Sequence, residues 1–190
     1  MATGVQYLAL LRGINVGGKN LVKMADLRAA FEVMELANVA TYIQSGNVLF
    51  RAPRQKREEL ASRIESELTR QFGSELKVAL LTEPQLRGVI EDAPSGFGAD
   101  SHLCDVIYVR KPLTVKRAMG VVELREGVDG AWAGKGVLYF ARLASRASSS
   151  RLSKIVARPE YQNMTIRSWS TTRKLLDLMD SRSNLRRVDD

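Results

Sequence analysis

The residues best suited to do chemistry form a loop near the start of the chain. Residues 12–20 have the sequence Arg-Gly-Ile-Asn-Val-Gly-Gly-Lys-Asn and follow a short apolar run from Tyr7 to Leu11. Two adjacent glycines leave backbone N–H groups unshielded, and the start of a following helix adds positive potential. Arg12 and Lys19 add two positive charges. This combination favours the binding of an anion such as a phosphate group.

Residues 13–20 resemble a nucleotide-binding P-loop, G-x-x-x-x-G-K-[ST], but differ from it at the last position. Asn20 stands where that motif has the hydroxyl that binds Mg²⁺ in an NTPase. No apolar strand ends in an Asp that could replace this hydroxyl, and the order of elements differs from that of the P-loop fold. The sequence therefore favours anion binding without hydrolysis. The alternative is a glycine-rich turn with solvated Arg12 and Lys19.

A second polar segment, Ser45-Gly46-Asn47, forms a tight turn between two strand-like runs. Ser45 and Asn47 can each donate a hydrogen bond to an oxyanion or a ribose hydroxyl. The alternative is an ordinary hairpin turn, because Gly and Asn tolerate positive φ. In the predicted site the cations neutralise charge, the glycines offer backbone donors and the Asn side chains orient the ligand. These residues are Arg12, Asn15, Gly17, Gly18, Lys19, Ser45 and Asn47.

Hydrophobic periodicity predicts an α+β protein made of two ferredoxin-like (split β-α-β) units. We expect the first unit over residues 1–95, the second over 96–180 with a C-terminal helix, and a disordered tail over 181–190. The predicted strands are residues 7–11, 39–43, 48–51, 76–81, 106–109, 127–132, 137–143 and 164–166. The predicted helices are residues 24–36, 54–72, 82–92, 114–124, 149–158 and 171–179.

This topology predicts which loops meet. In each unit the antiparallel sheet has the order 4-1-3-2 with helices on one face, so the loop after strand one lies at the same edge as the turn between strands two and three. Residues 12–20 and 45–47 should therefore converge, although they are far apart in the sequence. In the second unit, Arg110 and Lys111 should lie near Gly134 and Lys135.

Two blocks of the chain resemble a known bacterial family. The first block consists of residues 10–20 with Met24 and of residues 41–50, and it is similar to the family called "domain of unknown function 1697". This resemblance implies an α+β fold and a bacterial cytoplasmic setting, and it implies no established activity. A looser second block includes Ser153-Lys154-Ile155, Thr165, Arg167, Trp169, Thr171, Lys174 and Leu175. The family usually has Asn where this chain has Ser168.

Three residues of the second block could close over the same ligand. Arg167 offers a planar guanidinium, Trp169 offers a face on which a base can stack, and Lys154 adds positive charge. The alternative is that Trp169 packs the last helix against the body of the protein while Arg167 is exposed.

A nucleic-acid-binding function is the alternative to a phosphorylated small ligand. The net charge of +8 favours a polyanionic partner. Residues 107–109 and 135–140 partly resemble the two signatures of the RNA-recognition motif, on strands that should be neighbours. Tyr108 and Tyr139, assisted by Lys135, could then present a stacking platform. Otherwise the two tyrosines are ordinary strand aromatics.

Composition excludes several classes of site. His102 and Cys104 are the only residues of their types, so a disulfide framework and a Cys/His zinc site within one chain are excluded. We interpret them as a surface histidine and a semi-buried thiol. No stretch approaches the about 20 apolar residues of a membrane helix, and Met1 to Leu11 does not resemble a signal peptide. We expect a cytoplasmic protein without metal, cofactor or membrane partner.

Overall fold

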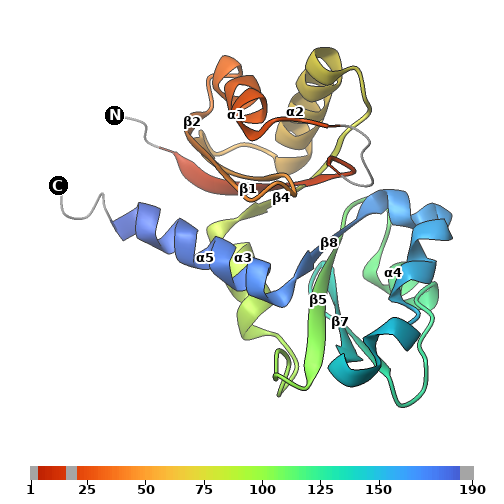
Figure 1. The fold of residues 1–190 in the computed structure, drawn as a ribbon. Coiled ribbons are helices and arrows are strands. Elements are labelled where there is room, and N and C mark those ends of the chain that lie inside the picture. The colour runs from red at the N-terminus through yellow and green to blue at the C-terminus, as the bar shows by residue number, and fades with distance from the viewer. Residues whose placement is uncertain (1–3, 16–20, 185–190) are drawn as a thin grey trace. The chain divides into compact units, whose positions relative to one another are not determined.

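The structure is a computed structural model that describes residues 4–15 and 21–184. The chain divides into two compact units, residues 1–85 together with 179–190, and residues 86–178. Each unit contains one four-stranded antiparallel sheet with helices, as the sequence predicts (Figure 1).

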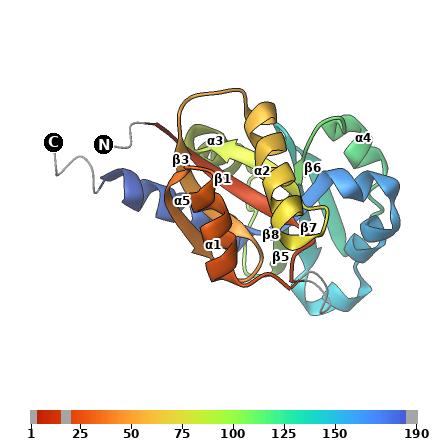
Figure 2. The ribbon, with the colours of Figure 1, turned by 90° about the horizontal axis from the view of Figure 1, so that it is seen from above.

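The first unit has strands in the order β2-β3-β1-β4, which is the predicted 4-1-3-2 arrangement. Helices α1 and α2 cover one face of this sheet (Figure 2). The strands are β1 (Val5–Arg12), β2 (Ala37–Tyr42), β3 (Asn47–Ala52) and β4 (Lys77–Thr82), and the helices are α1 (Met24–Val33) and α2 (Arg57–Phe72).

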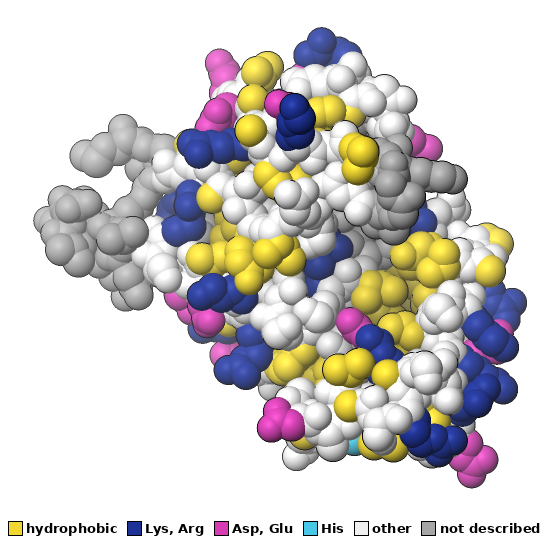
Figure 3. Space-filling view, in the orientation of Figure 1, with side chains coloured by type: hydrophobic (Ala, Val, Ile, Leu, Met, Phe, Trp, Pro, Cys, Tyr) yellow, Lys and Arg dark blue, Asp and Glu magenta, His cyan; other side chains and the backbone are white. Residues whose placement is uncertain are grey.

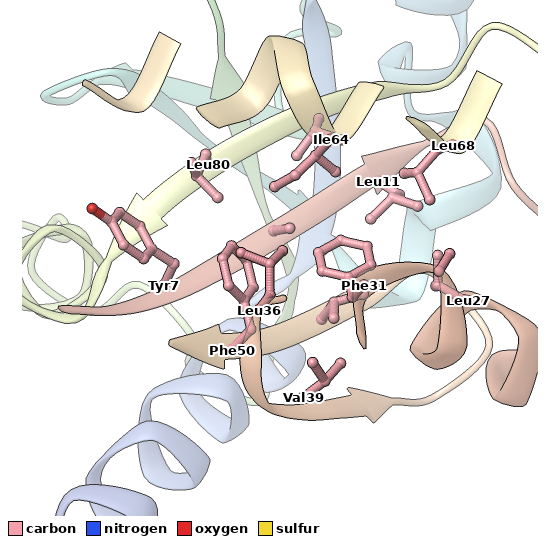
Figure 4. Close-up of a cluster of buried hydrophobic side chains, with 14 of the residues drawn as sticks. Tyr7, Leu11, Leu27, Phe31, Leu36, Val39, Phe50, Ile64, Leu68 and Leu80 are labelled. Carbon is pink, nitrogen blue, oxygen red and sulfur yellow. The ribbon is translucent and has the colours of Figure 1, made fainter. Parts of the chain in front are cut away.

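Helix α2 shows why this unit forms. Leu60, Ile64 and Leu68 recur every fourth residue and are fully buried against the sheet. The helix ends at Gly73, whose φ of 67° suits glycine. In the core beneath it, the ring of Phe50 stacks on Tyr7 and meets Phe31 edge-on, with centroids 5.6 and 5.4 Å apart (Figure 4). Burial of each such side chain contributes about 1.5–3 kcal/mol.

The second unit repeats the same strand order, β6-β7-β5-β8. Its strands are β5 (His102–Val109), β6 (Asp129–Ala133), β7 (Val137–Leu143) and β8 (Met164–Ser168). Helix α4 (Val115–Gly120) is shorter than the helix predicted for residues 114–124. The helix predicted for 149–158 is instead a series of 3₁₀ turns, η1 (Ala144–Ser149), η2 (Leu152–Ala157) and η3 (Pro159–Asn163). Serines compete for backbone hydrogen bonds and only Ile155 of η2 is buried, so this segment lacks a continuous apolar stripe.

Two further helices, α3 (Glu83–Glu91) and α5 (Trp169–Asn184), flank this unit's sheet on its second face. The hydroxyl of Tyr108 lies 3.2 Å from Thr172 Oγ1 on α5, and the hydroxyl of Tyr139 donates to the carbonyl of Val89 on α3 at 2.7 Å. The second sheet is therefore covered on both faces. Helix α5 extends to Asn184, so residues 181–184 of the expected tail are helical, and residues 185–190 lie outside the described residues.

Each unit has an equivalent hydrogen bond of its own at the end of its first strand. The N–H of Leu11 donates to the carbonyl of Gly46 at 2.8 Å, and the N–H of Val109 donates to that of Gly136 at 2.9 Å. Both glycines have positive φ, 73° and 78°. The strand pairs agree, because Leu10 lies opposite Asn47 as Tyr108 lies opposite Val137. Arg12 and Arg110 therefore occupy equivalent positions.

This equivalence gives a matched pair of substitutions. A Cβ at Gly46 would lie 2.6 Å from Ile14 Cδ1 and 2.8 Å from Leu11 Cβ, whereas a Cβ at Gly136 would meet nothing within 4 Å. Both alanines would carry the cost of positive φ, about 1–2 kcal/mol. Only Gly46→Ala adds overpacking, a further cost of about 1–3 kcal/mol. Urea denaturation followed by circular dichroism should show the larger loss of stability in Gly46→Ala. Equal losses would contradict the close packing of this turn.

Candidate functional site

The two segments predicted to form a site meet at one end of the two central strands of the first sheet, where β1 ends and β3 begins. We call this end of the sheet the edge. Besides the hydrogen bond from Leu11 to Gly46, the side-chain amide of Asn15 donates to the carbonyl of Gln44 at 2.9 Å. Antiparallel pairing of β1 with β3 produces this contact, because it places the end of one strand beside the start of the other. The predicted convergence of the two segments is confirmed for residues 11–15 and 44–47.

Asn15 holds this edge together. Its Oδ1 accepts from the N–H of Val22 at 2.8 Å, and its Nδ2 donates to the carbonyls of Val22 and Gln44 at 3.0 and 2.9 Å. Both amide hydrogens are therefore used within the protein. Asn15 fixes the two ends of the segment between residues 15 and 22 and joins them to the turn. It shapes the site, whereas the sequence had suggested that it orients a ligand.

Asn47 also shapes the site. It is fully buried, and its Nδ2 donates to the carbonyl of Tyr42 at 2.9 Å and to Ser45 Oγ at 3.0 Å. A side chain with no exposed surface does not reach a ligand in this arrangement, so the predicted contact of Asn47 with a ligand is replaced by support of the turn. Ser45 is half-buried and has its hydroxyl oriented by Asn47.

Arg12 brings positive charge to this edge. It is the last residue of β1, is half-buried, and lies directly opposite Lys77 of β4. Like charges at opposed positions destabilise a sheet unless anions offset them. Lys77 forms ion pairs with Glu75 and, at 4.0 Å, with Glu65. The other predicted residues of this loop, Gly17, Gly18 and Lys19, lie outside the described residues.

The backbone at this edge is unusual, because among the described residues 11–15 and 43–47 four have positive φ. They are Gly13, Asn15, Ile43 and Gly46, with φ of 79°, 53°, 48° and 73°. Ile43 is β-branched and 48% exposed, so no burial of its side chain explains this conformation. Asn15 and Ile43, the two that are not glycine, each carry a cost of about 1–3 kcal/mol, and residues strained in this way concentrate at functional sites. The strain therefore adds a second reason to regard this edge as a candidate site.

Arg167 and Trp169, predicted to close over the ligand, have structural partners in the second unit. Arg167 is only 9% exposed, so the expectation of an exposed guanidinium was wrong. Burial lowers the pKa of Arg167 to about 10, and its Nη1 donates to the carbonyl of Ile166 at 2.9 Å. The ring of Trp169 packs edge-on against Phe97 with centroids 5.1 Å apart, and it lies against Gly98. The packing interpretation of Trp169 is confirmed.

The stacking platform proposed for nucleic acid is not available. Tyr108 and Tyr139 are 2% and 1% exposed, because α3 and α5 cover the face of the sheet that carries them. Burial also raises the pKa of Tyr139 to about 12. Lys135 is exposed in the turn between β6 and β7. The prediction of exposed aromatics was wrong because alternation along a strand does not tell what packs on its second face.

His102 and Cys104 do not form a reactive pair. Cys104 is buried, its Sγ accepts from the N–H of Gly98 at 3.3 Å, and burial raises the pKa of its thiol. His102 is exposed, with Nδ1 2.9 Å from Ser101 Oγ. Within residues 4–15 and 21–184 there is no group of three or more His, Cys, Asp or Glu that could hold a metal ion. Over the same part of the chain, no helix is long and apolar enough to cross a membrane.

Sequence reasoning missed a group of ion pairs that we call the Glu123 cluster, which consists of Glu123, Arg151, Lys154 and Arg158. Nitrogen atoms of the three cations lie 3.8, 3.2 and 2.7 Å from the Glu123 carboxylate. Lys154, predicted to close over a ligand, belongs to this cluster. One signal was readable in the sequence, because residues 130–159 contain six Lys or Arg and no Asp or Glu.

Comparison with known proteins identifies the family. Residues 5–139 match the family model described as "Protein of unknown function (DUF1697)". The chain belongs to this family. The matched part of this DUF1697 chain includes both segments of the candidate edge. The fold resembles that of the conserved bacterial protein SP0830 from Streptococcus pneumoniae, with 26% identity and a TM-score of 0.81 over 92% of this chain and 98% of that chain. No curated protein matches.

The buried hydroxyl of Tyr139 leads to a prediction about pH. The unfolded chain loses the phenolic proton near pH 10, whereas the folded protein keeps it until about pH 12. Stability that is complete below pH 10 is therefore lost as the pH rises toward 12, by up to about 1.4 kcal/mol per pH unit. Tyr139→Phe should lower stability at pH 8 by about 1–3 kcal/mol, because the carbonyl of Val89 loses its donor.

The same variant should also lose less stability than the wild type between pH 10 and 11.5. Urea midpoints measured at pH 8, 10, 11 and 11.5 test both expectations. Parallel midpoint curves for the two proteins would show that titration of Tyr139 does not contribute.

Proposed function

We propose that this protein binds a phosphorylated or nucleotide-like ligand at the edge of the first sheet formed by residues 12–20 and 45–47. The observation that carries the proposal is the meeting of residues 11–15 with residues 44–47, which joins a half-buried arginine to a polar turn. Backbone held in place by other parts of the protein can present its N–H groups to an anion without further ordering.

The residues of this edge have different roles in the proposed site. Arg12 supplies positive charge, whereas the charge of Lys77, which lies opposite it on β4, is offset by Glu65 and Glu75. Ser45 supplies a hydroxyl at the turn. Asn15 joins the two segments by donating to the carbonyls of Val22 and Gln44, and Asn47 holds the turn by donating to the carbonyl of Tyr42 and to Ser45 Oγ. In this arrangement ligand contact falls to the arginine, the hydroxyl and the backbone, together with the sequence-predicted Lys19.

We propose binding and no particular reaction. Residues 12–20 and 43–47 contain no His, Cys, Asp or Glu, so the two segments supply no general base or strong nucleophile. Any catalysis would depend on positioning and on electrostatic stabilisation. A cytoplasmic, bacterial setting fits this proposal, because phosphorylated metabolites are dissolved there.

A thermal-shift panel tests the proposal. The panel contains inorganic phosphate, pyrophosphate, nucleotides and sugar phosphates, each at a series of concentrations. A ligand present at 100 times its Kd stabilises the folded state by about 2.7 kcal/mol. We expect at least one compound to raise the melting temperature of the wild type, and we expect Arg12→Ala and Lys19→Ala to reduce that shift.

Arg54→Ala is the matched control. Arg54 is exposed and follows β3, so the substitution removes the same charge as Arg12→Ala but at the opposite end of that strand. Arg12→Lys separates loss of charge from loss of the guanidinium. A compound whose shift survives in both Arg12→Ala and Lys19→Ala binds elsewhere, and the absence of any shift across the panel would refute the proposal.

A further inference from the structure

The Glu123 cluster places three cations around one carboxylate on the second unit. Arg158 Nη2 lies 2.7 Å from Glu123 Oε1, while Lys154 Nζ and Arg151 Nη1 lie 3.2 and 3.8 Å from Oε2. All four side chains are between 32% and 55% exposed. One negative charge cannot balance three positive charges, so the cluster has a net charge of +2.

The surroundings of the cluster are also basic. Between Leu86 and Leu178 the sequence has 15 Lys and Arg against 9 Asp and Glu, which gives this unit +6 of the total +8. A Cβ on Gly127 would lie 3.9 Å from Arg146 Nη1, so Arg146 reaches the loop that carries Glu123. Arg117 pairs with Glu160 at 3.1 Å. Figure 3 shows Lys and Arg side chains gathered along the right-hand side of this unit.

The backbone around the cluster is fixed. Asp129 Oδ2 accepts from the N–H groups of Arg125 and Arg151, both at 2.9 Å, and so ties the loop after α4 to the start of η2. Ile155 is buried and anchors η2 to the core of the second unit. The cations thus project from a rigid support, which lowers the entropy that must be lost when a ligand binds.

We propose that this face binds the phosphodiester backbone of a nucleic acid, and that Glu123 is an internal competitor that a phosphate group displaces. In the free protein, the carboxylate holds the three cations together. A phosphate that takes its place gains the hydrogen bonds that Lys154 and Arg158 now donate to Glu123 and the charge of Arg151. Two of the three cations are arginines, whose planar forks suit phosphate oxygens. Sequence-independent contacts of this kind position nucleic acid without reading bases.

The observations favour a nucleic acid over an anionic membrane. Membrane-surface segments need a broad apolar face beside their cations. In η2 the apolar Ile155 points into the core, and Val156 is its one large hydrophobic residue with high exposure. Residues 148–153, which lead into η2, instead carry hydroxyl groups, which commonly contact phosphate oxygens in nucleic-acid complexes. They belong to Ser148, Ser149, Ser150 and Ser153.

This inference is independent of the function proposed for the first unit. It uses none of the residues of that edge, and it does not need the buried Tyr108 and Tyr139. Arg12→Ala should therefore leave nucleic-acid binding unchanged, and a failure of one proposal can be distinguished from a failure of the other.

The test is the affinity of the full-length protein for a fluorescein-labelled 12-nucleotide oligouridylate and a 12-base-pair DNA duplex, measured by fluorescence polarisation at several salt concentrations. We expect Glu123→Gln to lower Kd about three- to tenfold, because it removes the competitor. Glu126→Gln is the matched control, since Glu126 is exposed on the same loop and its loss raises the net charge equally. It should change Kd about twofold or less.

Removal of a cation gives the opposite result. Arg158→Ala should raise Kd about fivefold and reduce the slope of log Kd against log salt by about 0.7 for the oligouridylate. Lys174→Ala, an exposed lysine on α5, is its charge-matched control. Circular dichroism checks that each variant is folded, and if Glu123→Gln is not, Lys154→Ala and Arg158→Ala still test the surface.

Three results would overturn the inference. Equal effects of Glu123→Gln and Glu126→Gln would show that Glu123 does not compete with the ligand. Binding to vesicles containing phosphatidylserine, without binding to either nucleic acid, would assign the surface to a membrane. Unchanged affinity in Arg158→Ala would place binding elsewhere. Binding of RNA, DNA or both supports the inference. The probe with the lower Kd shows which of the two nucleic acids this surface prefers.

Discussion

The hydrogen bond from the N–H of Leu11 to the carbonyl of Gly46 fixes the candidate site in the first unit. It holds the end of β1 against the turn before β3, in the same register that places Leu10 opposite Asn47. A slip of one residue would turn every side chain of β1 to the other face of the sheet. Leu11 would leave the core, and Asn15 would no longer reach the carbonyl of Gln44. The geometry of the polar edge therefore depends on the packing of the apolar strand.

The second unit obeys the same constraint with a different turn. Residues 134–136 connect β6 to β7, whereas residues 43–46 connect β2 to β3. The longer turn packs so closely on Leu11 and Ile14 that Gly46 has no room for a Cβ, while Gly136 stands in open space. The duplicated fold thus gives two equivalent edges, of which only the first is built tightly from both segments.

The sequence predicted the parts of the fold that depend on local periodicity and topology. Apolar spacing located both sheets, and the split β-α-β order predicted that residues 12–20 converge with residues 45–47, which residues 11–15 and 44–47 do. It did not predict that α3 and α5 cover Tyr108 and Tyr139, because the second face of a strand is settled by packing between distant segments. The functions of Asn15 and Asn47 were missed for a related reason, since an amide's partners are backbone groups that only the folded loop brings near.

Net charge is a second property of the sequence that does not locate a binding site. A value of +8 indicates an anionic partner but gives no position, since charge by itself does not specify a fold or a site. The position of a binding site depends on the backbone elements that carry the cations. Arg12 is held by a strand whose neighbour also carries a cation, and Arg151, Lys154 and Arg158 are held around a carboxylate on 3₁₀ turns anchored by Ile155. In the first case the backbone shapes the site. In the second, the acidic group that keeps the cations in place occupies the space that a phosphate would take, so stability of the free protein and affinity for a polyanion are opposed at Glu123.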